Sequence, residues 1–196
     1  MVVILMAVIA LGFVLIERGG NQQVASFTLF NLLSSEDCER ACWLGIEPGI
    51  TAGDEARIAL ENANISFENV ELPGGGGGIY DFSQNDGIQG FISFSDQAVN
   101  QINLGIDFCL SRVLSEYGIP AEVQEDGIYF TFLYPDSGLI FNVNVDDRTR
   151  VAGVLLTSRP VFEANFSGDS LEHNWDEFKD RFAGDCEDSL APLGAG

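Results

Sequence analysis

Residues 74–78 are five consecutive glycines, a composition that can let a backbone wrap around a phosphate group. A phosphate-binding loop of this kind needs Gly-x4-Gly-Lys-Ser/Thr at the start of a helix. The backbone amides, the lysine and the N-terminus of the helix then bind the phosphates jointly. Here neither lysine nor serine or threonine directly follows the run, and Ile79-Tyr80 begins a pattern that is typical of a strand. We therefore interpret the run as a flexible insertion and not as a nucleotide site.

The four cysteines allow either two disulfides or one metal site. Cys38 and Cys42 do not have the redox Cys-x-x-Cys spacing, and the four residues lack the repeated close pairs of a structural zinc site. We expect Cys38 to pair with Cys42. We expect Cys109 to pair with Cys186, which would fasten the C-terminal segment to the rest of the domain. Such bonds persist in an oxidising compartment.

Other groups that could perform chemistry give weaker signals. His173 is the only histidine and stands in an acidic segment between Glu172 and Asn174, so a surface role is expected, because a catalytic triad requires a positioned partner. Acidic residues are too numerous for one catalytic pair to stand out. The acidic turns at 145–150 and 167–177 offer oxygen ligands for calcium, but neither matches an EF-hand, which favours solvated loops. We expect no catalytic residue, metal or cofactor.

The charge balance limits the class of partner. The chain has 196 residues, of which 30 are acidic and 9 basic, for a net charge of −21. Nucleic-acid binding requires a basic face that neutralises phosphates, so nucleic acid is excluded as a partner. Cations and basic proteins remain compatible, and the charge also has the simpler role of keeping the protein soluble.

The N-terminal segment is apolar. Residues 1–16 carry no charge and are followed by Glu17 and Arg18. A membrane-spanning helix needs about 20 such residues, whereas a cleaved signal peptide would have a basic start that is missing here. The sequence predicts a membrane anchor at 1–20, with a signal segment as the alternative. Together with the expected disulfides, it predicts one N-terminal membrane helix with the domain outside the cytoplasm.

The middle of the chain contains an internal repeat. Gly49-Ile50 matches Gly105-Ile106, and Gly78-Ile79-Tyr80 matches Gly127-Ile128-Tyr129, in the same order along the chain. Each unit reads as an amphipathic helix followed by three strands. We predict a first αβββ repeat over 49–104 and a second over 105–158.

The fold class predicted from this repeat is α+β, with two tandem αβββ repeats that form an antiparallel sheet with helices on one face. A linker and lead-in segment over 21–48 precedes the repeats. A closing helix and tail over 159–196 follows them, and Trp175 on that helix is expected to pack on the core.

Short motifs around the helices support a family resemblance. "PGIT" at 48–51 would open the first helix, and "YGIP" at 117–120 would close the second. This arrangement resembles the repeat of the beta-lactamase-inhibitory proteins and of BamE (SmpA/OmlA)-like envelope proteins. The stretch "ACWLGIEPGIT" is similar to the entry segment of uncharacterised bacterial membrane-anchored proteins. The resemblance implies a concave sheet that binds a partner protein.

Three functions are compatible with these features. The first is a non-enzymatic binding or assembly module, attached to the membrane, whose outward sheet face contacts an unidentified protein. The candidate contact residues alternate away from the expected core and are Phe91, Ser93, Asn142 and Asn144. The second is a structural accessory subunit of a larger membrane protein complex. The third is an enzyme that uses carboxylates or calcium.

Overall fold

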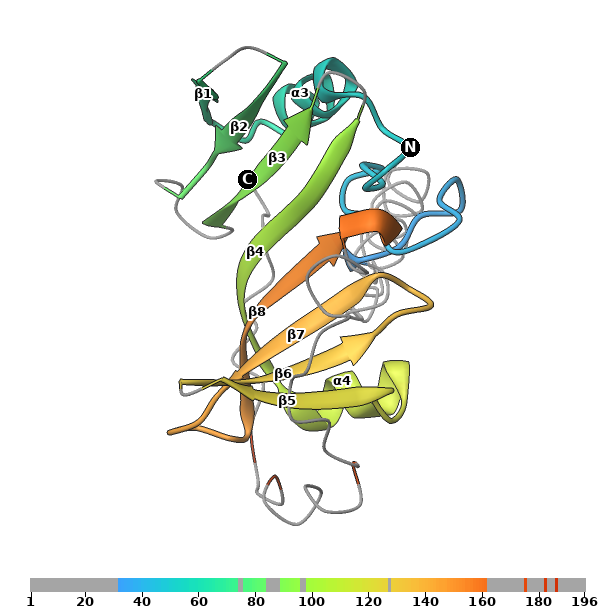
Figure 1. The fold of residues 1–196 in the computed structure, drawn as a ribbon, viewed down its shortest axis with the longest axis vertical. Helices are drawn as coiled ribbons and strands as arrows, with labels where there is room; N and C mark the ends of the chain where they lie inside the picture. Colours follow the sequence, from blue (N-terminus) through green and yellow to red (C-terminus); the bar gives the residue numbers. More distant parts are fainter. Residues whose placement is uncertain are drawn as a thin grey trace, which may run out of the picture.

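One antiparallel sheet of eight strands dominates the computed structural model, which describes residues 32–73, 76–83, 89–95, 98–126 and 128–161 together with Trp175, Phe182 and Cys186 (Figure 1). The strand order across the sheet is β1-β2-β3-β4-β8-β7-β6-β5. The strands are β1 (Glu68–Glu71), β2 (Gly77–Asp81), β3 (Gln89–Ser95), β4 (Val99–Cys109), β5 (Glu122–Asp126), β6 (Tyr129–Tyr134), β7 (Leu139–Asn144) and β8 (Arg150–Thr157).

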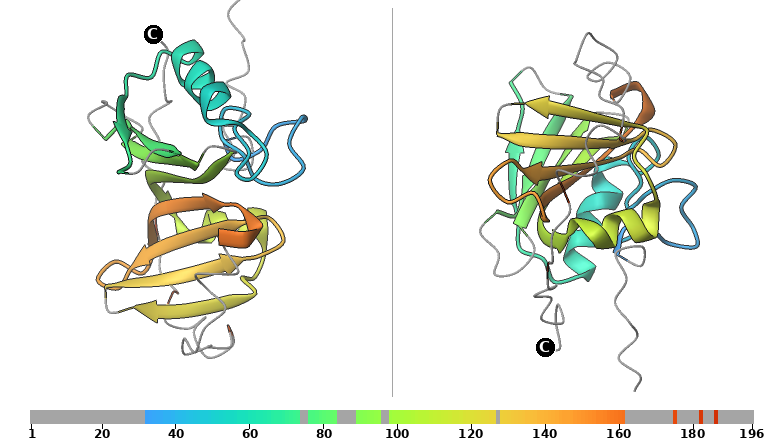
Figure 2. Two further views of the ribbon diagram at one scale, coloured as in Figure 1. Left: turned by 45° about the horizontal axis from the view of Figure 1, so that its top comes forward. Right: turned by 90° about the horizontal axis from the view of Figure 1, so that it is seen from below.

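The sheet consists of two halves that meet at one pair of strands. Helix α3 (Gly53–Asn62) precedes strands β1 to β4, and helix α4 (Leu110–Tyr117) precedes strands β5 to β8. Strands β4 and β8 pair with each other from Gln101↔Thr157 to Cys109↔Arg150, with a register shift between Gly105 and Phe108. The sheet is strongly twisted, so that β5 and β6 run across the direction of β3 (Figures 1 and 2).

The predicted α+β fold of two αβββ repeats with helices on one face is wrong. The structure is mainly a single eight-stranded sheet with short helices, and each half has four strands instead of three. The two strands that the sequence did not reveal are β1 and β5, one at each edge of the sheet. All four residues of β1 are exposed, so the strand lacks the apolar alternation by which strands are recognised.

The predicted membrane helix is also corrected. No helix in the part of the chain that the structure describes is long and apolar enough to cross a membrane. The prediction relied on the hydropathy of residues 1–20, and these residues lie outside the described ranges. The predicted location outside the cytoplasm rested on that helix together with the expected disulfides, and without the helix it is withdrawn. Most of the predicted closing helix also lies outside the described residues.

The hydrophobic core lies on one face of the sheet, where alternate residues of the strands have buried apolar side chains. Ile102 of β4 pairs with Ile92 of β3 and with Leu156 of β8, and all three side chains are fully buried. Both helices and the C-terminal segment add to this core, with Ala56, Leu60, Leu110, Val113, Trp175 and Phe182. Trp175 and Phe182 meet the ring of Phe132 edge-on, at centroid distances of 5.9 and 5.1 Å. Trp175 therefore packs on the core.

The glycine run has a structural role at its C-terminal end. Gly77 and Gly78 belong to strand β2 and pair with Ser95 and Phe94. A Cβ atom on Gly78 would lie 2.7 Å from Cζ of Phe94, and one on Gly77 would lie 2.5 Å from the Phe94 carbonyl oxygen. These two residues are glycines because β2 lies against Phe94 without room for a side chain, and they are not part of an insertion.

Substitution of Gly77 by alanine should therefore destabilise the protein. We expect Gly77→Ala to lower the free energy of unfolding by about 1–3 kcal/mol, because the added methyl group would collide with backbone atoms. Chemical denaturation measures this change. Gly105→Ala is the matched control, since its Cβ would meet nothing closer than 3.6 Å. Equal stability of the two variants would contradict the packing described for β2.

Both expected disulfides are present. Cys38 is bonded to Cys42 and Cys109 to Cys186, so all four cysteines are used. The second bond joins the end of β4 to the C-terminal segment, across a sequence separation of 77 residues. It therefore constrains the unfolded chain far more than the first, whose separation is 4 residues.

Removal of the two disulfides should have unequal effects. The chain-entropy relation gives a loss of about 4.5 kcal/mol for Cys109→Ser with Cys186→Ser, and about 2 kcal/mol for Cys38→Ser with Cys42→Ser. Denaturant titration of the two double variants without reductant measures both losses of unfolding free energy. A larger loss from the Cys38–Cys42 pair would contradict this assignment of their roles.

Candidate functional site: a cavity beside the disulfide loop

Residues 33–47, which we call the disulfide loop, are held in place by buried apolar side chains. Leu33, Trp43 and Ile46 are each only 1% exposed. Trp43 stacks on Phe82 at a centroid distance of 5.3 Å, and it pairs with Ile46 in an isolated bridge. Between Trp43 and Ile46 the backbone reverses through two residues of positive φ, as in the type I′ turns of hairpins. The loop is therefore a fixed part of the domain.

The disulfide loop is also fastened to the turn between β6 and β7. Nη2 of Arg40 donates a hydrogen bond to the carbonyl oxygen of Pro135 at 2.9 Å, and the backbone N–H of Ala41 donates to the carbonyl of Ser137 at 3.2 Å. Gly138 is required in this turn, because its φ is +71° and a Cβ there would lie 2.8 Å from Nη2 of Arg40. The arginine thus connects segments that lie 95 residues apart.

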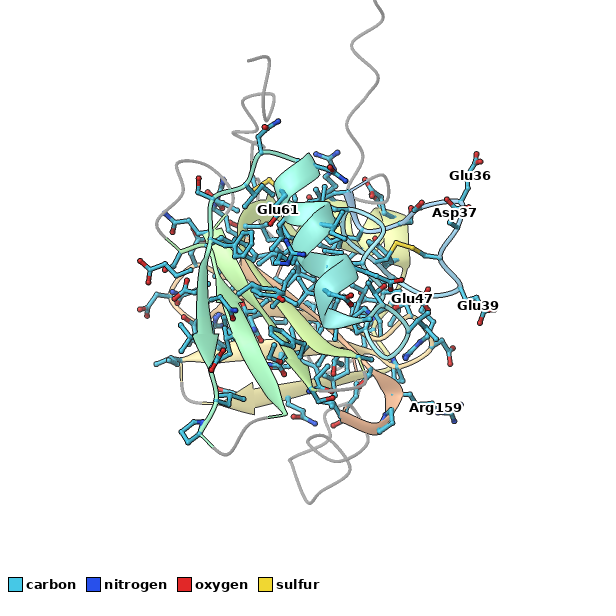
Figure 3. The ribbon with its side chains drawn as sticks, turned by 90° about the horizontal axis from the view of Figure 1, so that it is seen from above. Glu36, Asp37, Glu39, Glu47, Glu61 and Arg159 are labelled. Carbon is cyan, nitrogen blue, oxygen red and sulfur yellow. A yellow bond between two sulfur atoms is a disulfide. The ribbon has the colours of Figure 1, made fainter. Side chains whose placement is uncertain are left out.

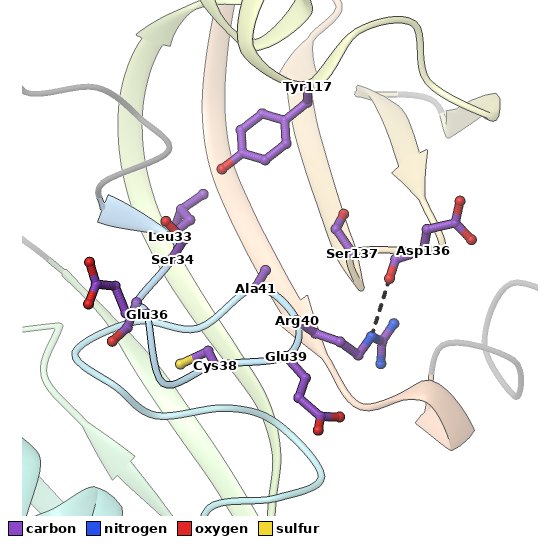
Figure 4. A pocket seen from close by; sticks show the side chains of 11 residues that line it. Leu33, Ser34, Glu36, Cys38, Glu39, Arg40, Ala41, Tyr117, Asp136 and Ser137 are labelled. Carbon is purple, nitrogen blue, oxygen red and sulfur yellow. Dashed lines mark hydrogen bonds between the residues drawn. The ribbon is translucent and has the colours of Figure 1, made fainter.

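A cavity of about 870 Å³ lies between the disulfide loop, the end of α4 and the β6–β7 turn (Figure 4). Its size is within the range of about 300–1,000 Å³ that is usual for ligand sites. The lining residues in the loop run from Leu33 to Ala41. Tyr117 of α4 and Asp136 and Ser137 of the turn complete the wall.

The Tyr117 hydroxyl group is the most unusual polar group of this cavity. The Tyr117 ring packs against Tyr134 and Phe141, at centroid distances of 6.0 and 5.6 Å. Its hydroxyl group is buried and has no hydrogen-bond partner among the described residues. The neighbouring Tyr134, by contrast, donates its hydroxyl hydrogen to the carbonyl of Gly118 at 2.9 Å. A buried polar group without a partner costs about 1–3 kcal/mol, which suggests a binding role for Tyr117.

The rim of the cavity is acidic. Glu36, Asp37 and Glu39 are exposed and project outward from the disulfide loop (Figure 3). Asp136 adds an exposed carboxylate on the opposite side. The loop is further stiffened by Glu47, which is 5% exposed and whose carboxylate accepts a hydrogen bond from the Glu39 N–H at 3.0 Å. The negative charges are therefore presented in a fixed arrangement.

The four contact residues predicted from the sequence lie on the sheet face opposite the core. Phe91 and Ser93 alternate with the buried Ile92 on β3, and Asn142 and Asn144 alternate with the buried Val143 on β7. All four are half-buried, and strands β4 and β8 separate the two pairs.

The accessible part of this outward face is limited. Ile140 of β7 and Leu133 of β6 lie on the same face as Asn142 and are each 1% exposed. The side chain of Asn142 is engaged as well, because its Oδ1 accepts a hydrogen bond from the Thr131 hydroxyl at 3.2 Å. Near the middle of the sheet Gly105 is exposed, so the open part of the face is its centre and first half.

Sequence reasoning missed the cavity. Tyr117 begins the "YGIP" motif, which predicts only the end of a helix, and nothing in that motif shows that the tyrosine hydroxyl is unpaired. The contact between Arg40 and Pro135 has no local signature, because it joins distant segments. The one usable signal was the cluster of three acidic residues around Cys38.

Comparison with known proteins gives no assignment: the chain matches no family model, no curated protein and no solved structure. The resemblance to beta-lactamase-inhibitory and BamE-like proteins therefore stays a prediction. Within the described ranges, no three His, Cys, Asp or Glu side chains are grouped so that they could hold a metal ion.

Alkaline pH provides a test of the buried tyrosines. Burial is the main reason that the pKa of Tyr117 and that of Tyr134 both lie well above the ordinary value of 10.0, and Glu116 raises the pKa of Tyr117 further. In the unfolded chain both phenols ionise near pH 10. The stability that comes from keeping them neutral is therefore complete below about pH 10 and is lost as the pH rises further toward the folded pKa.

We expect the free energy of unfolding to fall above about pH 10, and to fall less steeply in Tyr117→Phe, which removes one of the two phenols. Denaturant titrations at several alkaline pH values measure this slope. Identical slopes for the wild type and the variant would show that Tyr117 is not buried as described.

Proposed function

We propose that this protein is a non-enzymatic binding module whose partner is a protein with a basic contact surface. The proposal rests mainly on one observation: positive charges of the described part are engaged within the chain, while the acidic rim of the cavity faces solvent. Arg57 pairs with Glu61, Arg112 with Glu116 and Arg150 with Asp107. Arg40 and Arg148 donate to backbone carbonyls of Pro135 and Val145.

The disulfide loop has the anatomy of a protein-binding site. Protein interfaces combine a concave apolar centre, into which a partner residue inserts, with a polar rim that remains near solvent. Here Leu33, Ala41 and the Tyr117 ring form the apolar wall, and Glu36 and Glu39 lie at its edge. The fixed rim charges would attract a basic partner and orient it before contact.

A charge-reversed peptide pair tests this proposal. The probe is acetyl-Gly-Arg-Tyr-Arg-Gly-amide, which we call the arginine peptide, and its control carries glutamate in place of both arginines. We expect only the arginine peptide to bind, and to bind more weakly at high salt, because exposed charges are screened. The triple variant Glu36→Gln, Asp37→Asn, Glu39→Gln, which we call the loop variant, should bind the arginine peptide about tenfold more weakly. Isothermal titration calorimetry measures each dissociation constant.

A second triple variant controls for net charge. Glu68→Gln, Glu71→Gln and Asp146→Asn also remove three exposed carboxylates, but from positions outside the cavity. We expect this variant to bind the arginine peptide almost as well as the wild type. Equal losses from both triple variants would mean that only net charge matters. If Phe91→Ala lost binding of the arginine peptide and the loop variant kept it, the partner would instead bind on the outward sheet face.

A further inference from the structure

The unpaired hydroxyl group of Tyr117 indicates what kind of side chain the cavity accepts. The hydroxyl is buried, lacks a hydrogen-bond partner in the described part of the chain, and is directed toward Leu33 and Ala41 across the cavity (Figure 4). None of the residues that line the cavity is hydrogen-bonded to it. A ligand that enters the cavity and brings one hydrogen-bonding group to Tyr117 would remove this deficit, and an entirely apolar ligand would leave it in place.

We propose that the cavity binds a single side chain of the partner, one that is mainly apolar, ends in a neutral hydrogen-bonding group, and is flanked by basic residues. Tyrosine is the simplest natural side chain of this description. The inference rests on the proposed function and adds to it the chemistry of the anchoring residue. The apolar part of the anchor would contact Leu33 and Ala41, and its polar end would pair with Tyr117.

The polar end of the anchor is neutral because the cavity offers little to stabilise a charge. A carboxylate would be repelled by the acidic rim formed by Glu36, Glu39 and Asp136. An ammonium group would lose hydration beside Leu33 and Ala41, and the side chains of Glu36 and Glu39 point away from Tyr117 (Figure 4). The guanidinium group of Arg40 is already used in hydrogen bonds to Pro135 and Asp136.

Basic residues on either side of the anchor would lie at the rim, where the carboxylates point. These charges remain near solvent, so they contribute more to the rate of association and to the choice of partner than to the strength of the final complex. The anchor supplies the buried contact, which is where a few residues carry most of the binding energy. The two parts of the site thus select for different features of one peptide segment.

A double-mutant cycle between protein and peptide tests the anchor. The arginine peptide is compared with the same peptide carrying phenylalanine in place of tyrosine, against the wild type and against Tyr117→Phe. We expect the wild type to bind the tyrosine form about fivefold more tightly, which is the effect of one hydrogen bond. In Tyr117→Phe this preference should disappear. Tyr134→Phe is the matched control and should keep it, because the Tyr134 hydroxyl is used by Gly118.

Ala41→Leu provides a second variant that does not depend on Tyr117. The larger side chain would fill part of the cavity, and it should weaken binding of both peptides. Thermal unfolding verifies that each variant is folded. If the wild type binds both peptides equally and Ala41→Leu has no effect, the anchor inference is wrong, although charge-dependent binding would still support the proposed function. If no arginine-containing peptide binds, both are wrong.

Discussion

The pairing of β4 with β8 is the interaction on which the rest of the structure depends. Among the described strands it is the pair that joins the two four-stranded halves of the sheet, and its central contact aligns Ile102 with Leu156 in the core. Strand β4 also anchors the segment that follows the disulfide loop, because the N–H of Gly49 donates a hydrogen bond to the carbonyl of Val99 at 2.7 Å. The cavity, whose walls come from both the loop and the second half, depends on this junction.

Patterns that repeat along the chain made part of the fold predictable. In the second half of strand β7 the buried Phe141 and Val143 alternate with half-buried asparagines. Helix α4 ends at Tyr117, just before Gly118, which has a φ of +78°. The cysteine pairing was predictable too, because few alternatives existed. Strands β1 and β5 were not recognised, since they are short edge strands rich in glutamate, and edge strands use charge to prevent pairing with other chains.

The candidate site was much less predictable than the fold. Its residues come from segments that are distant in the sequence, and the contacts that join them are mostly to backbone carbonyls, as between Arg40 and Pro135. Any residue offers such a carbonyl, so residue types give no signal. Tyr117 shows the same limit, because an aromatic residue on an apolar helix face looks like core whether or not its hydroxyl is paired. The glycine run shows it as well, because the sequence predicts a flexible insertion whereas Gly77 and Gly78 accommodate Phe94.

The cavity is the place where we propose that a basic partner inserts one neutral, polar-ended side chain. A crystal structure of the wild-type protein with the arginine peptide tests this most directly. We expect the peptide tyrosine inside the cavity, with its hydroxyl group hydrogen-bonded to that of Tyr117 and its arginines beside Glu36 and Glu39. A peptide bound on the outward sheet face near Phe91, with the cavity unchanged, would contradict it.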